Sequence, residues 1–175
     1  MPTQFSSSAS TVRGLTRAAL CTACVCLLAP VSIPIGPVSL TLGVFAILLA
    51  GALLPPALAA LSACAYLLLG FAGLPVFAGF AAGPGVLFGM TGGYLLAYPI
   101  MAWLLSMACE KTRSRGARMV GVALANLCCY LLGTAWFMAA TGMGLWASLS
   151  ACVIPFILPD LAKGWCALWL AERLR

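Results

Sequence analysis

Long apolar runs separated by short polar, glycine-rich or proline-rich stretches dominate the chain. Six such runs can be drawn, at residues 14–32, 39–54, 57–72, 86–108, 118–140 and 147–172. A helix needs about 20 residues to cross the hydrocarbon core of a bilayer, so the pattern predicts membrane-spanning helices. The second and third runs are short and meet at Pro55 and Pro56. One broken helix there would give five spans, and two helices would give six.

The placement of the charged residues favours six spans. Apart from Asp160 and Lys163, the charged residues lie in three places: Arg13 and Arg17 at the start of the first run, Glu110 to Arg118 around the connection between the fourth and fifth runs, and Glu172, Arg173 and Arg175 at the C-terminus. With six spans these three regions share one side of the membrane, and Lys and Arg are enriched on the cytoplasmic side. Five spans would export the basic cluster at 111–118. We therefore predict an all-α integral membrane protein with six transmembrane helices and both termini in the cytoplasm.

Composition agrees with a multi-pass protein of the cytoplasmic membrane. The 175 residues are 64% hydrophobic and 7% charged, and the mean hydropathy of +1.13 is too high for a water-soluble domain of this length. The net charge of +6 follows from insertion topology and requires no nucleic-acid partner. The basic residues can also contact anionic membrane lipids.

The serine-rich N-terminus is expected to lie outside the helical domain. We predict a disordered cytoplasmic tail at residues 1–12 and a single six-helix domain at residues 13–175. Arg13 and Arg17 precede an apolar run, as in a secretory signal, but no small-residue cleavage site stands out after Ala29. The first run is therefore interpreted as a retained helix.

No pattern in the chain predicts an enzyme, a metal site or a cofactor. There is no histidine, which excludes Ser–His and Cys–His catalysis. Of the nine cysteines, Cys21 and Cys24 share a helical face while Cys26 turns away, so we interpret the thiols as packing groups. The glycine-rich stretch GVLFGMTGG lacks the lysine of a phosphate-binding loop.

On the six-helix topology the outer connections, 33–38, 73–85 and 141–146, carry no charge. The middle connection and its flank place several glycines around aromatic side chains. Such a segment can approach a ligand closely and can move. Phe77 and Gly79 are therefore candidate ligand contacts, and a re-entrant packing loop without a ligand is the alternative.

Asp160 and Lys163 stand three residues apart in an otherwise apolar run, so they share one helix face. Each costs about 2.5–3.5 kcal/mol at the centre of a membrane helix, and such residues normally face a bundle interior or a wet cavity. A salt bridge that only fixes helix packing is one interpretation. The other is a binding site.

Two prolines favour the binding site. Pro155 and Pro159 each remove a helical donor, so we expect the helix to begin again at Pro159, with Asp160 at its N-terminus. An outward-facing apolar pocket with one acceptor and one cation at its floor suits a small amphiphile with N–H groups and a carboxylate. Polar side chains that could line it, or could instead make interhelical hydrogen bonds, are Thr91, Tyr94, Asn126, Tyr130 and Ser39.

Four stretches of the chain resemble the BioY-type biotin transporters, the substrate-binding S components of energy-coupling factor (ECF) systems. They are AAL with the following Cys-Thr-Ala in the first helix, SIPIGPVSLTLGVFAILLAGALLPP from Ser32, LLLGFAGLPVFAGFAAGPGVLFGMTGGYLLAYP from Leu67, and PDLAK from Pro159. They cover most of the chain in the order found in the family.

The resemblance implies high-affinity capture of biotin from outside, energised by a separate module of a transmembrane coupling protein and two ATPase subunits. It implies that Asp160 accepts from the ureido N–H groups and that Lys163 orients Asp160 or meets the ligand. Ala19 and Ala23 match the small-xxx-small pattern that docks on the coupling subunit. Two alternatives from the residues remain: an ion-coupled small-solute transporter in which Asp160 cycles protons, and a non-transport membrane scaffold subunit.

Overall fold

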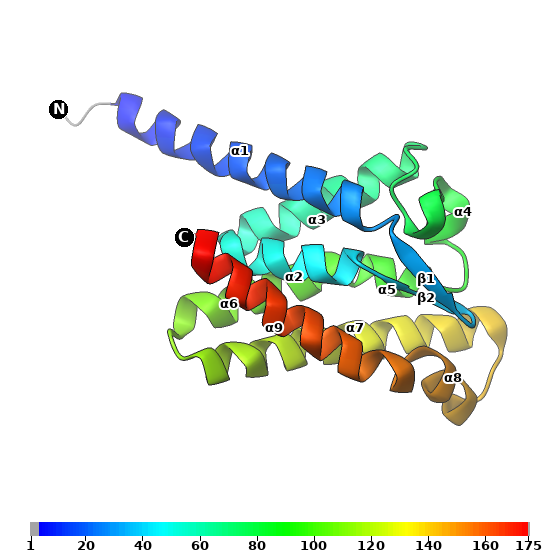
Figure 1. Cartoon of the computed structure of the whole chain (residues 1–175). Helices are drawn as coiled ribbons and strands as arrows, with labels where there is room; N and C mark the ends of the chain where they lie inside the picture. Colours follow the sequence, from blue (N-terminus) through cyan, green and yellow to red (C-terminus); the bar gives the residue numbers. More distant parts are fainter. Residues whose placement is uncertain (1–3, 175) are drawn as a thin grey trace.

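Figure 1 shows the computed structural model of the chain, which describes the backbone of residues 4–174 and the side chains of residues 11–174. The longer helices are α1 (Gln4–Leu28), α3 (Pro56–Phe71), α6 (Tyr98–Lys111), α7 (Arg115–Thr141) and α9 (Ile157–Leu174). The shorter helices are α2 (Gly43–Leu53), α4 (Pro84–Leu87), α5 (Gly92–Leu96) and α8 (Leu145–Cys152). Two 3₁₀ turns, η1 (Ala78–Phe80) and η2 (Ile154–Phe156), and two strands, β1 (Ser32–Ile35) and β2 (Val38–Thr41), connect them.

The prediction of a mainly helical chain with helices of membrane length is confirmed. Among the described residues, the segments long and apolar enough to span a bilayer are Thr11–Leu28, Gly92–Lys111, Arg115–Thr141 and Leu145–Leu174. The apolar helices α2 and α3 are shorter, and Pro55 separates them. α2 lies at the centre of the bundle, because it contacts α1, α3, α6 and α9.

The prediction of an all-α fold is wrong at residues 32–41, where β1 and β2 form an antiparallel hairpin (Figure 1). The sequence there, SIPIGPVSLT, is rich in β-branched residues. Gly36 occupies the two-residue turn with φ of +68°, a conformation that glycine adopts without a steric penalty. The second apolar run therefore becomes helical only at Gly43, not at residue 39.

The N-terminal boundary also differs from the prediction. α1 begins at Gln4, so residues 4–12 extend the helix where a disordered tail was expected. No proline occurs between residue 4 and the end of α1, so the helical hydrogen bonds can continue through the serines. Residues 1–3 of the predicted tail lie outside the described residues.

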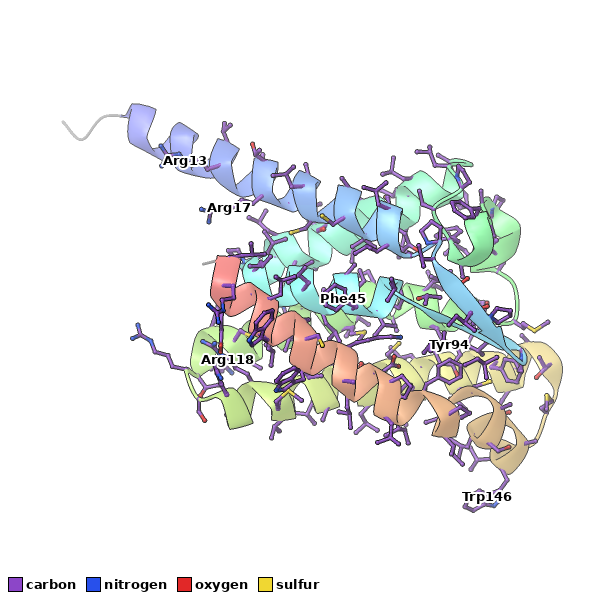
Figure 2. All side chains as sticks on the ribbon, viewed as in Figure 1. Arg13, Arg17, Phe45, Tyr94, Arg118 and Trp146 are labelled. Atoms are coloured by element: carbon purple, nitrogen blue, oxygen red, sulfur yellow. The ribbon has the colours of Figure 1, made fainter. Side chains whose placement is uncertain are left out.

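Figure 1 shows the two ends of the bundle, and the side chains in Figure 2 show that these ends differ chemically. We call the end formed by the early turns of α1, the α6–α7 connection and the C-terminal turns of α9 the charged end. We call the end that carries β1, β2, α4 and α8 the hairpin end. Figure 2 shows Arg13, Arg17 and Arg118 at the charged end and Trp146 at the hairpin end.

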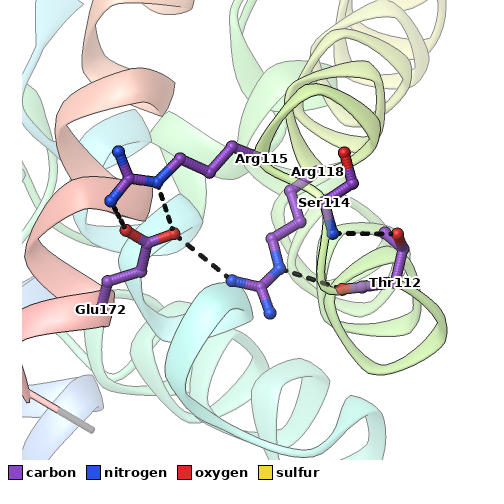
Figure 3. A network of polar contacts seen from close by, with 5 residues as sticks. All are labelled: Thr112, Ser114, Arg115, Arg118 and Glu172. Carbon is purple, nitrogen blue, oxygen red and sulfur yellow. Dashed lines mark hydrogen bonds and ion pairs between the residues drawn. The ribbon is translucent and has the colours of Figure 1, made fainter.

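Ion pairs join the distant segments of the charged end. The Glu172 carboxylate lies 2.6 Å from Arg115 Nη2 and 3.5 Å from Arg118 Nη1. Figure 3 marks both ion pairs with dashed lines. Arg17 and Leu174 line one cavity, which brings α1 to the same place. Exposed ion pairs add little stability, but these contacts show that the three charged regions of the sequence meet at one end.

Candidate functional site

The buried Asp160 carboxylate has a donor at each of its oxygens. Lys163 Nζ donates to Asp160 Oδ1 at 2.9 Å, and Tyr130 Oη donates to Asp160 Oδ2 at 2.8 Å. Asp160 is 4% exposed, so this is a charged group removed from solvent and compensated by protein partners. Asp160 and Lys163 lie on one helix face, as predicted, and they form an ion pair.

A break in the last apolar run positions the carboxylate. α8 ends at Cys152, η2 contains Pro155, and α9 begins at Ile157 with Asp160 in its first turn. The helix begins again as predicted, but it does so at Ile157, two residues before the predicted position at Pro159. The N-terminus of an 18-residue helix carries partial positive charge, which favours an anionic side chain in the first turn.

The carboxylate keeps spare hydrogen-bonding capacity. Two carboxylate oxygens offer about four lone-pair sites in total, and the protein donors seen here use two of them. Asp160 can therefore accept further hydrogen bonds from a ligand without losing Lys163 or Tyr130. Because both protein partners fix its orientation, the acceptor is preorganised.

Two adjoining cavities lie between this pair and the hairpin end. A cavity of about 50 Å³ contains Asp160 and Lys163, and a cavity of about 260 Å³ extends to Phe77 and Thr91. Together they just reach the lower bound of about 300 Å³ that is typical of small-molecule sites. The residues that line both are Val38, Ser39, Thr41, Tyr94 and Tyr98. We call the two together the Asp160 cavity.

Aromatic side chains form much of its wall and are held in place by packing. Tyr94, labelled in Figure 2, shares a hydrogen bond of 3.1 Å between its hydroxyl and Thr134 Oγ1. Its ring lies directly against Gly133, where a Cβ would overlap it. Phe77 is fully buried and meets Tyr66 edge to face at 5.6 Å. Such fixed rings present an apolar, shape-defined surface to a ligand.

The structure brings together five of the predicted site residues and separates two. Asp160, Lys163, Tyr94, Thr91 and Phe77 line the Asp160 cavity. Gly79, with φ of +66°, lines neither part of it and donates its backbone N–H to the carbonyl of Pro30. Asn126 lines a different cavity.

The cavity that Asn126 lines is separate from the Asp160 cavity. It is an apolar groove of about 550 Å³ between α7, α8 and α9. Asn126 is 4% exposed, and its amide nitrogen and oxygen have no hydrogen-bond partner among the described residues. Tyr130 lines both the groove and the Asp160 cavity, so it stands between them. The groove is larger but lacks a charged group, whereas the Asp160 cavity combines charge, hydroxyls and aromatic walls.

The remaining contacts of the cavity have only weak signals in the sequence. Tyr130 was one of several polar side chains considered, but its contact with Asp160 joins residues 30 positions apart. Thr41, Tyr98, Cys129, Cys152 and Phe156 also line the cavity and were not predicted. In the described part of the chain, no group of three or more metal-ligating side chains occurs.

Comparisons with known proteins agree over nearly the whole chain. The model of the BioY family matches residues 1–175. The chain is 41% identical over 147 residues to the probable biotin transporter BioY of Pyrococcus horikoshii, covering 84% of this chain and 86% of that protein. It is 34% identical over 154 residues to the biotin transporter BioY of Thermotoga maritima, covering 87% and 80%.

A crystal structure of the S-component for biotin from an ECF-type ABC transporter has the same fold. Its TM-score against this chain is 0.88 at 29% sequence identity, and the match covers 95% of this chain and 93% of that one. The similarity therefore extends over the whole bundle and does not rest on one motif.

Proposed function

The chain belongs to the BioY family, and we propose that it captures biotin in the Asp160 cavity and takes it up across the cytoplasmic membrane as an ECF S component. Its relatives are named as biotin transporters, and its fold matches an S-component for biotin. Members of this family are transport proteins and not enzymes. The expected role of the cavity is therefore to bind the transported substrate.

The main support for the proposal is the Asp160 carboxylate, which accepts hydrogen bonds from Lys163 and Tyr130 at one end of a cavity with aromatic walls. Biotin has a cyclic urea with N–H donors, an apolar thioether ring and a carboxylate on a short chain. Asp160 accepts from a ureido N–H group, and Lys163 and Tyr130 hold the acceptor in place. Phe77, Tyr94 and Thr91 surround the rest of the ligand.

Replacing Asp160 by asparagine tests this assignment. An amide keeps the shape of the side chain but loses the charge, and hydrogen bonds to charged groups contribute about 1.5–3 kcal/mol. We therefore expect Asp160→Asn to weaken biotin binding by about 10–100-fold, measured by calorimetry on protein purified in detergent.

Glu110→Gln provides the matched control, because it makes the same chemical change at the exposed charged end and should leave the dissociation constant unchanged. Both variants should elute as wild type in size exclusion. Wild-type affinity in a correctly folded Asp160→Asn protein would remove Asp160 from the site.

The proposed topology has six transmembrane helices and both termini in the cytoplasm. The contacts of Arg115 and Arg118 with Glu172 support it, since they place the α6–α7 connection beside the C-terminal turns of α9. The exposed positive charges gathered at that end favour the cytoplasmic side. The hairpin end, with the mouth of the cavity, then faces outward.

Alkaline phosphatase fusions test the topology, because the enzyme is active only after export. A fusion after Arg113 should be inactive and a fusion after Met143 active, since the α6–α7 connection is cytoplasmic and the α7–α8 connection external. Five spans with a cytoplasmic N-terminus would reverse both results. That reversal would contradict the six-helix proposal.

Coupling to a transmembrane protein and two ATPase subunits is proposed to use the exposed face of α1. Ala19 and Ala23 are exposed on that helix, whereas Ala18 and Thr22 face the bundle. The same spacing at Ala59 and Ala63 is fully buried. Small exposed residues allow a partner helix to approach the backbone closely.

The double change Ala19→Leu and Ala23→Leu should disturb this contact. Overpacking of a close interface costs about 1–3 kcal/mol, so recovery of coupling subunits with tagged protein should fall about fivefold or more. Biotin binding should not change. Ala139→Leu, at an exposed position of α7, is the control, and wild-type recovery by the double variant would exclude this face.

Neither alternative from the sequence is favoured. A scaffold subunit and an ion-coupled transporter both fit a buried carboxylate, but the relatives are named as biotin transporters and the fold matches an ECF-type S-component.

A further inference from the structure

The charged groups around the Asp160 cavity are confined to one end of it. Of the charged residues with described side chains, Asp160 and Lys163 are the ones that line the cavity. Those in the α6–α7 connection and in the last turns of α9 lie at the charged end of the bundle. Toward the hairpin end the wall consists of uncharged residues, namely Pro37, Phe77, Ala78, Ala81, Val86 and Thr91.

Lys163 already has an ion-pair partner in the protein. Its ammonium lies 2.9 Å from Asp160 Oδ1, so the pair has no net charge. A ligand carboxylate placed at Lys163 would also stand next to the Asp160 carboxylate. Two carboxylates that share one site repel each other, and one of them then becomes difficult to ionise. The pair is therefore a poor site for an anion and a good site for a neutral donor.

Biotin carries its neutral urea and its carboxylate at opposite ends. If the urea binds Asp160, the chain extends toward Thr91 and the hairpin turn, where Pro37 is exposed and the cavity approaches the surface. The polar side-chain groups that line this part of the cavity are the hydroxyls of Ser39, Thr41, Thr91, Tyr94 and Tyr98. A hydroxyl can donate to a carboxylate, an ester carbonyl or an amide carbonyl, but it lacks the full positive charge with which a cation selects the carboxylate.

We propose that the carboxylate of biotin points away from the charged pair and meets no cation, so that the protein also binds biotin derivatives whose carboxyl group is neutral. This inference rests on the proposed function and extends it to the ligand class. Recognition is directed at the fused ring system, and the charge at the end of the chain contributes little.

Calorimetric titration of the wild-type protein with biotin, biotinamide and biotin methyl ester at pH 7 tests the inference. A cationic partner would contribute about 1.5–3 kcal/mol to binding of the carboxylate. Removing the charge would then weaken binding by about 10–100-fold. We expect instead that both neutral derivatives bind within about fivefold of biotin.

A loss of tenfold or more for both derivatives would overturn the inference while leaving biotin capture intact. The variant Lys163→Met then locates the error: a preference for biotin that disappears in this variant places the carboxylate at Lys163. If neither biotin nor biotinamide binds to correctly folded protein, the proposed function itself fails. The titrations therefore distinguish a wrong orientation of bound biotin from a failure of the protein to bind biotin at all.

Discussion

Asp160 is the charged residue that lies in the buried core of the described residues, and such a group costs about 2.5–3.5 kcal/mol in a membrane helix. Lys163 and Tyr130 compensate it with one hydrogen bond at each oxygen. Stability alone does not explain the arrangement, because replacing a buried ion pair by apolar residues is often neutral or stabilising. We propose that it serves as an oriented acceptor with lone pairs left for a ligand, and that this requirement shapes the cavity around it.

The backbone around the pair follows from the same requirement. The last apolar run must break to place Asp160 at the start of a helix, and Pro155 lies in the 3₁₀ turn that breaks it. The β1–β2 hairpin then supplies Val38, Ser39 and Thr41 to the opposite wall. Among the described residues, the remaining charges gather at the far end, and the cavity lining toward the hairpin end is uncharged. The proposed topology and the proposed ligand preference would therefore both follow from the same charge asymmetry.

The sequence predicted the features that depend on local spacing. Asp160 and Lys163 lie three residues apart on one helix, and the prolines marked the restart of that helix within two residues. Features that depend on packing between distant segments were missed or misplaced. Asn126 and Tyr130 stand four residues apart on α7, yet only Tyr130 contacts Asp160, since helical spacing alone does not show which residue reaches across to α9. The hairpin was overlooked because its apolar residues continued into the run that forms α2.

We propose that the urea of biotin binds Asp160 inside the cavity and not in the groove along α7. A structure of the protein determined with bound biotin is the sharpest test. We expect a ureido nitrogen within about 3 Å of an Asp160 carboxylate oxygen, with the carboxylate of biotin directed toward Thr91 and the hairpin turn. Biotin in the groove beside Asn126, or with its carboxylate on Lys163, would contradict it.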